Sequence, residues 1–237
     1  SYLMSDGLPM HKSPLYKKPT TSLEVFTNRD LRLSGTVAKG GDAWIGSRPV
    51  FVIANPSFNT TGWAFRKFIN IDDWTLQKSN MDRPLIRYAE VLLINAEASF
   101  ELDGAISDAT LDNTINKLRP RAGIAKLTNA FVTTNGLDIK AEIRRERRVE
   151  LAMEGFRYWD LIRWKTAEIE LPKPVLGNYF FAEEYGTAVA VNLTPDNYII
   201  ALDAKFKKFE PAKDYLFPFP LNELALNPAL TQNPGWK

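Results

Sequence analysis

The chain has 237 residues, of which 45% are hydrophobic and 24% are charged, a composition typical of a soluble globular protein. Its formal net charge of +2 gives no electrostatic argument for nucleic-acid binding, and the lack of cysteine excludes disulfides, thiolate metal sites and a cysteine nucleophile. One histidine, His11, rules out a histidine-rich metal site and argues against a serine–histidine hydrolase. No apolar run approaches the ~18 residues of a membrane-spanning helix.

The first part of the chain, up to about residue 82, predicts a loop-rich layer that lies over another part of the fold. Prolines and glycines interrupt it repeatedly, and only residues 31–37 and 49–54 have the composition of short strands. We expect it to be too irregular to build a core of its own. Three of the six tryptophans lie in this layer: Trp44, Trp63 and Trp74.

Residues 83–102 predict a long buried helix, because apolar residues cover most of its circumference and the charged residues share one narrow stripe. Pro84 falls in its first turn, where proline is tolerated. A second helix is expected from about Asp108 and is closed by Pro120 and Gly123. A polar loop should follow at residues 128–136.

The stretch from residue 138 to residue 164 contains the densest helical pattern, and Asp138 is a plausible N-cap. Acidic residues recur at every fourth position from 138 to 154 and form one row along the helix. Two of them, Glu146 and Glu150, fall amid the apolar face, where a carboxylate is costly unless a cation meets it. We therefore expect both to be buried in a structural ion-pair network, whose predicted members are Glu146, Glu150, Arg87, Arg144 and Arg147.

The helical segments between about residues 83 and 167 form two successive hairpins, which are typical of tetratricopeptide-like solenoids. Such hairpins usually need about three stacked repeats to bury their faces, so further helices are expected outside this chain. After Glu170 the chain becomes irregular and rich in proline, with one expected strand at residues 197–202. Its apolar ending should pack on the helical body.

Motifs spread over nearly the whole chain carry a family resemblance. The strongest are IRRER at 143–147 and EGFRYWDL at 154–161, accompanied by NRDLRL at 28–33, RPLIRYAEVLL at 83–93 and the ending from LFP at 216–218 to NPG at 233–235. In these segments the chain resembles the C-terminal part of the SusD/RagB family of surface glycan-binding lipoproteins. The resemblance implies a mainly α, tetratricopeptide-like fold with few short strands.

The same resemblance implies one C-terminal SusD/RagB-type domain over residues 1–237, with a helical hairpin core at about 83–167 and loop-rich layers on either side. It also implies non-catalytic binding of an oligosaccharide, a polysaccharide or a related nutrient. The expected partner is a SusC-like TonB-dependent outer-membrane transporter. Family members are anchored at the cell surface through an N-terminal lipid-bearing cysteine and carry an N-terminal half with most of the helices; both are expected to lie outside this chain.

The irregular layer offers the side chains that sugar recognition requires. The apolar C–H face of a pyranose stacks on an aromatic ring, while amide groups bind the hydroxyls. No family motif transfers to single positions here, so these candidates rest on residue types alone. The candidate glycan-binding residues are Trp44, Trp63, Phe58, Asn55 and Asn59.

Other interpretations remain open. A protein-interaction scaffold or a peptide-binding transporter lid is the main competitor, since tetratricopeptide surfaces often bind proteins. A glycoside hydrolase needs two carboxylates about 5–9.5 Å apart, and nothing in the sequence marks such a pair. The arginines near Arg144 alternate with glutamates and do not predict a nucleic-acid surface. No metal or other cofactor is expected, and the tryptophans other than Trp44 and Trp63 are expected to be structural.

Overall fold

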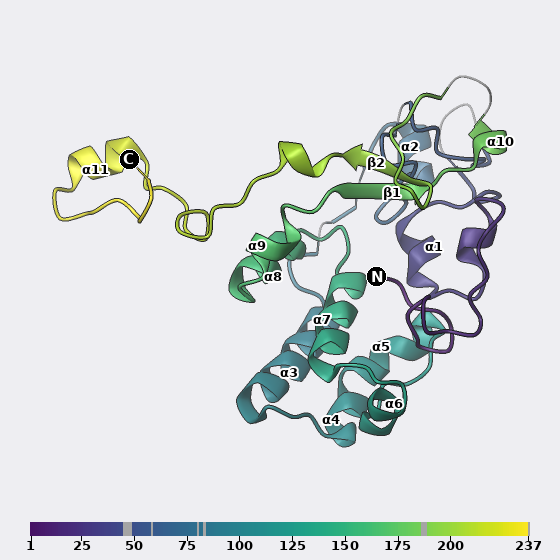
Figure 1. Ribbon diagram of the computed structural model, residues 1–237, viewed down its shortest axis with the longest axis horizontal. Coiled ribbons are helices and arrows are strands. Elements are labelled where there is room, and N and C mark those ends of the chain that lie inside the picture. The colour runs from purple at the N-terminus through teal and green to yellow at the C-terminus, as the bar shows by residue number, and fades with distance from the viewer. Residues whose placement is uncertain (45–48, 58, 80, 83, 186–188, 237) are drawn as a thin grey trace.

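The computed structural model describes residues 1–44, 49–57, 59–79, 81–82, 84–185 and 189–236 (Figure 1). Its elements are α1 (Arg32–Thr36), α2 (Ile71–Leu76), α3 (Tyr88–Asp103), α4 (Asp108–Asn113), α5 (Ile115–Ala122), α6 (Asn129–Thr134), α7 (Ile139–Glu150), α8 (Phe156–Arg163), α9 (Ala167–Glu170), β1 (Val175–Tyr179), α10 (Ala182–Tyr185), β2 (Tyr198–Leu202) and α11 (Leu221–Leu226). This confirms the predicted mainly α fold with few short strands. None of the described helices is both long and apolar enough to cross a membrane.

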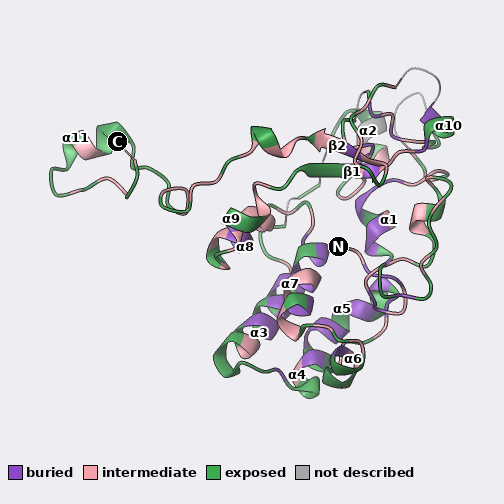
Figure 2. Cartoon of the chain, in the orientation of Figure 1, coloured by how far each residue is buried: buried purple, intermediate pink, exposed green. Residues whose placement is uncertain are grey.

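The helical body is centred on α3 and α7, which pack against each other, while α4 and α5 pack against α3. Its main core is made of apolar side chains from all four helices, among them Leu93, Ala96, Leu111, Ile115 and Ile143. Figure 2 shows these inward faces as buried and the outward faces of the same helices as exposed. The predicted amphipathic pattern of α7 therefore buries the face that carries Ile143.

The single helix predicted from about Asp108 is broken at Thr114 into α4 and α5, and Pro120 lies inside α5 and does not close it. Two further helix predictions also differ from the structure. Helix α3 begins at Tyr88, several residues after the predicted start, because Arg87 adopts an extended backbone (φ −127°, ψ 155°) that ends the preceding loop. A short helix, α6, also occupies most of the segment 128–136, which was expected to be a loop. The hydroxyl of Thr128 caps its N-terminus by accepting a backbone N–H, which satisfies a donor that the helix itself leaves unpaired.

The prediction of two strands in the loop-rich layer is wrong for both segments. Residues 31–37 contain α1, and the carboxylate of Asp30 accepts the backbone N–H of Arg32 at 2.9 Å, which favours a helical turn over an extended strand. The segment 49–54 makes only an isolated bridge between Ala43 and Val50 within the described residues. The runs of alternating apolar residues in these two segments were thus too short to predict strands correctly.

A small antiparallel hairpin of β1 and β2 covers one end of the molecule. The strand predicted at residues 197–202 is confirmed as β2, whereas β1 was not predicted. Tyr179 of β1 lies opposite Tyr198 of β2 in the register. The backbone N–H of Asn178 donates to the Thr61 carbonyl at 2.8 Å, so the hairpin is tied to the loop-rich layer.

Glycine is required at position 177 by this close approach. A Cβ atom at Gly177 would lie 2.1 Å from the carbonyl oxygen of Thr61, which is backbone and cannot rotate away. We expect Gly177→Ala to lower the free energy of unfolding by about 1–3 kcal/mol, as overpacking does elsewhere. Urea denaturation followed by circular dichroism measures this.

The matched control is Gly35→Ala in α1, where a Cβ would meet nothing within 4 Å. Alanine in a helix is favoured over glycine by about 0.5–1 kcal/mol, so this variant should be as stable as the parent or slightly more stable. Equal stability of the Gly177→Ala and Gly35→Ala proteins would contradict the proposed backbone contact.

The C-terminal segment leaves the body after β2 and carries α11 at its far end, away from the helices (Figure 1). It contacts the body through Phe217, whose ring lies 6.0 Å from that of Trp159, and through Tyr215, over whose ring the Lys165 ammonium lies at 4.0 Å. The indole of Trp236 folds back onto the segment itself by donating to the Leu216 carbonyl at 2.9 Å. The expectation that the whole ending packs on the helical body is therefore wrong for α11.

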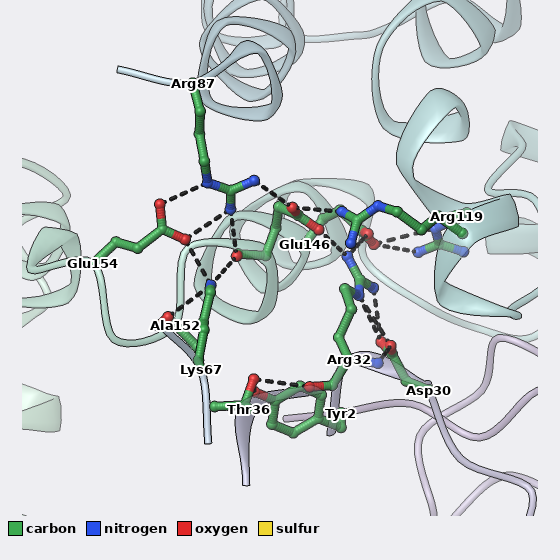
Figure 3. A network of polar contacts seen from close by, with 12 residues as sticks. Tyr2, Asp30, Arg32, Thr36, Lys67, Arg87, Arg119, Glu146, Ala152 and Glu154 are labelled. Atoms are coloured by element: carbon green, nitrogen blue, oxygen red, sulfur yellow. Dashed lines mark hydrogen bonds and ion pairs between the residues drawn. The ribbon is translucent and has the colours of Figure 1, made fainter. Parts of the chain in front are cut away.

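Buried charges join the loop-rich layer to α7 (Figure 3). The Arg32 guanidinium from α1 lies 2.6 Å from one carboxylate oxygen of Glu146 and 3.1 Å from one of Glu150, and it also pairs with Asp30 at 2.7 Å. Arg119 of α5 lies 3.1 Å from the other carboxylate oxygen of Glu146. Both glutamates are buried and paired with arginines, which is the arrangement that their position on the apolar face requires.

A second half of this network lies at the C-terminal end of α7. Arg87 donates to Glu150 at 2.8 Å and to Glu154 at 2.6 Å. The Lys67 ammonium also reaches Glu154, at 2.6 Å, and donates to the carbonyl oxygen of Ala152 at 2.9 Å (Figure 3). Lys67 of the loop-rich layer and Arg87 at the N-cap of α3 thus both bind the C-terminal end of α7 and the turn that follows it.

Arg144 and Arg147 were predicted to belong to this network, but the structure places both outside it. Arg144 pairs with Glu101 at 3.6 Å and lies over the Trp164 ring, whereas Arg147 pairs with Asp160 of α8 at 2.9 Å. On the helical wheel both side chains point away from Glu146, and Arg147, although it lies on the same side as Glu150, is paired with Asp160 of α8. They stabilise the contacts of α7 with α3 and α8 instead.

The network predicts a loss of stability in acid. Burial alone would raise the pKa of Glu150 and of Glu154, but the hydrogen bonds from Arg87, together with the other nearby cations, outweigh burial and lower both pKa values. A carboxylate with a lowered folded-state pKa stabilises the fold above its unfolded value, about 4.3, and loses that contribution as the pH falls through the folded value. The urea midpoint should therefore drop as the pH is lowered below about 4.3.

Substitution of Arg87 tests the cause of this acid sensitivity. Arg87→Gln removes the donor shared by Glu150 and Glu154, so the urea midpoint should depend less steeply on pH below about 4.3. Arg144→Gln removes a pairing with the half-exposed Glu101 and should leave the parent pH dependence intact. Identical pH profiles for the parent and Arg87→Gln would show that these carboxylates are not responsible.

Candidate functional site

A cavity of about 760 Å³ lies between the N-terminal segment and the β1–β2 hairpin, and we call it the main cavity. Its walls come from residues 1–37, from Trp63 and Phe65, and from residues 177–179 and 198 of the hairpin. No residue of helices α2 to α11 lines it among the described residues. Its volume suits a ligand of several sugar units or a small organic molecule.

Aromatic rings surround the main cavity on several sides. Trp63 is half-buried and held by an edge-to-face contact with Phe26, with the ring centroids 6.2 Å apart at 88°. On the hairpin, the rings of Tyr179 and Tyr198 meet edge to face at 5.7 Å. Because these neighbours fix the rings, the cavity presents preorganised aromatic surface to a ligand.

The hairpin positions these tyrosines through its register and through a buried amide. Asn178 is buried beside them, and its side-chain oxygen accepts the backbone N–H of Tyr179 at 2.8 Å. Burial raises the pKa of Tyr198, so its phenol remains protonated and able to donate a hydrogen bond at neutral pH. Trp63, whose indole N–H makes no hydrogen bond within the described residues, also lines the cavity.

Cationic side chains occupy the N-terminal wall of the main cavity. The Arg29 guanidinium donates to the carbonyls of Tyr2 and Val25 at 3.1 and 3.3 Å, and burial lowers its pKa. The ammonium of Lys18 lies 5.5 Å from the centroid of the Tyr179 ring. Lys17, next to it, also lines the cavity.

Among the described residues, the main cavity lacks the pair of carboxylates that a glycoside hydrolase uses. Among the described residues that line it, Glu24 is the one carboxylate, and hydrogen bonds from Thr20 lower its pKa. Glycoside hydrolysis by the usual route requires two flanking carboxylates. No group of three or more acidic, histidine or cysteine side chains in the described part of the chain is arranged to hold a metal ion.

The predicted glycan-binding residues do not form one cluster. Trp63 lines the main cavity, but Trp44 packs against Phe51, with ring centroids 4.8 Å apart, beside a separate small core. All members of this core belong to the loop-rich layer, so the prediction that the layer forms no core of its own is wrong. The Asn55 side chain is used within its own turn, where it accepts the backbone N–H of Ser57 at 2.8 Å. Asn59 is exposed and does not line the main cavity, and Phe58 lies outside the described residues.

Tyr179, Tyr198 and the lysines at 17 and 18 were missed as site residues. The N-terminal segment and the hairpin are separated by more than a hundred residues in the sequence, and only the fold brings them together. A local signal did exist, since aromatic and lysine residues alternate with prolines in the first twenty residues. It did not distinguish a binding wall from a surface loop.

Comparison with known proteins gives a consistent result. A family model described as the SusD family matches residues 1–236. A SusD-like protein from Formosa agariphila is 33% identical over 156 residues, which is 64% of this chain and 25% of that protein. A SusD-like protein from Bacteroides ovatus is 28% identical over 187 residues, covering 69% of this chain and 32% of that protein.

Solved structures agree with these sequence matches. A crystal structure described as a SusD-like carbohydrate binding protein from Bacteroides fragilis superposes with a TM-score of 0.71 at 28% identity, covering 96% of this chain and 46% of that one. A second SusD-like structure from the same species, at 22% identity and a TM-score of 0.66, covers 99% of this chain and 45% of its own and supports the fold alone. The chain thus spans less than half of these solved proteins and about a quarter to a third of the curated relatives.

Proposed function

Because this chain belongs to the SusD family, we propose that it binds an oligosaccharide, a polysaccharide or a related nutrient in the main cavity without chemically changing it. The observation that carries this proposal is the half-buried Trp63 facing a preformed cavity together with Tyr179 and Tyr198. The carbohydrate-binding description of the 28% identical Bacteroides fragilis structure supports the same class of ligand.

The chemistry of the cavity suits sugar recognition. A pyranose has an apolar face that stacks on aromatic rings and a rim of hydroxyls that need hydrogen-bond partners. Trp63 offers a fixed ring, and the phenols of Tyr179 and Tyr198 and the indole N–H supply polar partners at its edge. The single lining carboxylate, Glu24, supports binding in preference to hydrolysis.

The wider role follows from the family. We place the protein at the surface of the outer membrane, anchored by lipid on an N-terminal cysteine outside this chain, where it delivers its ligand to a SusC-like TonB-dependent transporter. Residues 1–237 then act as one C-terminal SusD/RagB-type domain. Its helical core, at about 83–167, serves as a scaffold, while the loop-rich layer carries the ligand.

One observation favours a protein partner for a different surface. The outward face of α3 carries the exposed apolar side chains of Tyr88, Val91, Ile94 and Leu102, of which Tyr88 is 69% and Leu102 is 83% exposed, with Asn95 and Glu101 among them. Exposed apolar stripes of this kind usually mark contact surfaces. We propose that helices from the N-terminal half of the same protein cover this stripe, since the solved relatives are more than twice as long as this chain. A scaffold that binds another protein there is the competing function.

A glycan panel tests the proposed function. The intact protein is applied to immobilised oligosaccharides of different composition, and released reducing sugar is measured in parallel. The proposal predicts retention on at least one class of glycan and no release of reducing ends. Binding to none of them, or hydrolysis of a bound one, would overturn it.

A further inference from the structure

We infer that the ligand of the main cavity is an anionic glycan, one whose sugar units carry carboxylate or sulfate groups. The inference rests on the proposed function, which identifies the cavity as the glycan site. Its basis is a local excess of positive charge. Lys17, Lys18 and Arg29 line the cavity, against the single carboxylate of Glu24, although the chain as a whole is nearly balanced in charge.

The three cations have no ion-pair partner in the described part of the protein. None of the ion pairs among the described residues includes Lys17, Lys18 or Arg29. The Arg29 guanidinium is partly buried and bonded to main-chain carbonyls, whose dipoles hold it in place without cancelling its charge. Burial lowers the pKa of Arg29 and outweighs the opposing influence of the nearby Asp30 carboxylate, so a ligand anion would relieve part of the cost of burying this charge.

The single acidic side chain that lines the cavity, Glu24, already accepts hydrogen bonds from the protein. Glu24 accepts hydrogen bonds from the backbone N–H of Thr20 at 2.7 Å and from the Thr20 hydroxyl at 2.9 Å. These bonds hold its carboxylate against its own loop. The structure gives no ion pair between Glu24 and a lysine in the described part of the chain, so the positive wall remains available to a ligand.

The cations also lie where a stacked sugar would present its substituents. Lys18 is 5.5 Å from the centroid of the Tyr179 ring, and both side chains line the cavity with Trp63. A pyranose lying on an aromatic ring directs its ring substituents outward, toward side chains beside the ring. A carboxylate or sulfate on that sugar can therefore reach an ammonium group while the apolar face stays stacked, and such charge-assisted hydrogen bonds are about twice as strong as neutral ones.

The test compares three oligosaccharides of equal length: a neutral one, one containing uronic acids and one carrying sulfate. Binding to the intact protein is measured by isothermal titration calorimetry. At least one anionic oligosaccharide should bind about tenfold or more tightly than the neutral one. This preference should shrink when the salt concentration is raised from about 0.05 M to about 0.5 M, because the lysines are exposed and screened.

Substitution of the lysines tests their role. Lys17→Gln/Lys18→Gln should weaken binding of the anionic oligosaccharide by about tenfold and leave the neutral one within about twofold. The matched control is Lys117→Gln/Lys126→Gln, which removes the same charge from the helical body outside the cavity and should change neither affinity. All four lysines are exposed, so both variants should fold.

The outcomes separate the inference from the proposed function. If the neutral oligosaccharide binds as tightly as both anionic ones, or if the Lys17→Gln/Lys18→Gln protein keeps full affinity for the anionic ligand, the inference is overturned while glycan binding stands. If polyglutamate, which is anionic without sugar rings, binds as tightly as the glycans, the basic wall acts as a general anion surface and the inference also fails. If no oligosaccharide binds, the proposed function falls together with it.

Discussion

The Glu146→Gln protein is expected to unfold with a free energy about 3–5 kcal/mol lower than that of the parent. Glu146 is only 1% exposed and its two carboxylate oxygens meet Arg32 and Arg119, the second of which is fully buried. Glutamine keeps the shape but removes the charge, so the buried Arg119 loses its ion-pair partner, while Arg32 keeps Asp30 and Glu150. Urea denaturation at pH 7, followed by circular dichroism, gives the difference.

Glu101→Gln is the control for this substitution. Its carboxylate is 44% exposed and pairs with Lys140 at 2.9 Å on the surface, where ion pairs contribute about 0–1 kcal/mol. The two variants make the same chemical change on neighbouring helices, in buried and in exposed settings. If both lose less than about 1 kcal/mol, the buried network is not what joins the loop-rich layer to α7.

The Trp63→Ala protein is expected to bind its glycan at least about tenfold more weakly than the parent, a loss of about 1.4 kcal/mol or more. Alanine removes the ring that lies in the main cavity and leaves Phe26 without its edge-to-face partner. Trp63→Phe keeps an aromatic face and should recover part of the affinity. Calorimetric titration of the three proteins with the glycan identified from the panel measures this.

Trp44→Ala provides the comparison that separates binding from packing. Trp44 lies against Phe51 and does not line the main cavity, so its loss should lower stability and leave the affinity unchanged. Thermal unfolding of each variant controls for misfolding. If Trp44→Ala weakens binding as much as Trp63→Ala does, the ligand lies elsewhere in the loop-rich layer.

The helical framework could be predicted because its signals are local. The pattern around Ile143 and the N-cap at Asp138 predicted α7 closely, and the position of Glu146 on the apolar face predicted a buried carboxylate with a cationic partner. The identity of that partner could not be predicted. Arg32 lies 114 residues away, in a segment whose short alternating pattern predicted a strand instead of α1.

The candidate site could be predicted only in part, for a related reason. Trp63, which lines the main cavity, was predicted from its residue type and its place among turn residues. The positions of Tyr179 and Lys18 in the cavity depend on the pairing of β1 with β2 and on the course of the N-terminal segment. Both are set by long-range contacts, such as the bond from Asn178 to Thr61. A periodic pattern in one segment carries no information about which distant segment it meets.

The most direct test of the proposed site is a crystal structure of the intact protein with its glycan bound. We predict a sugar ring stacked on Trp63 inside the main cavity, with its polar groups toward Tyr179 and an acidic substituent within hydrogen-bonding distance of Lys17, Lys18 or Arg29. A glycan bound against Trp44 or on the helical body, with the main cavity empty, would contradict the account.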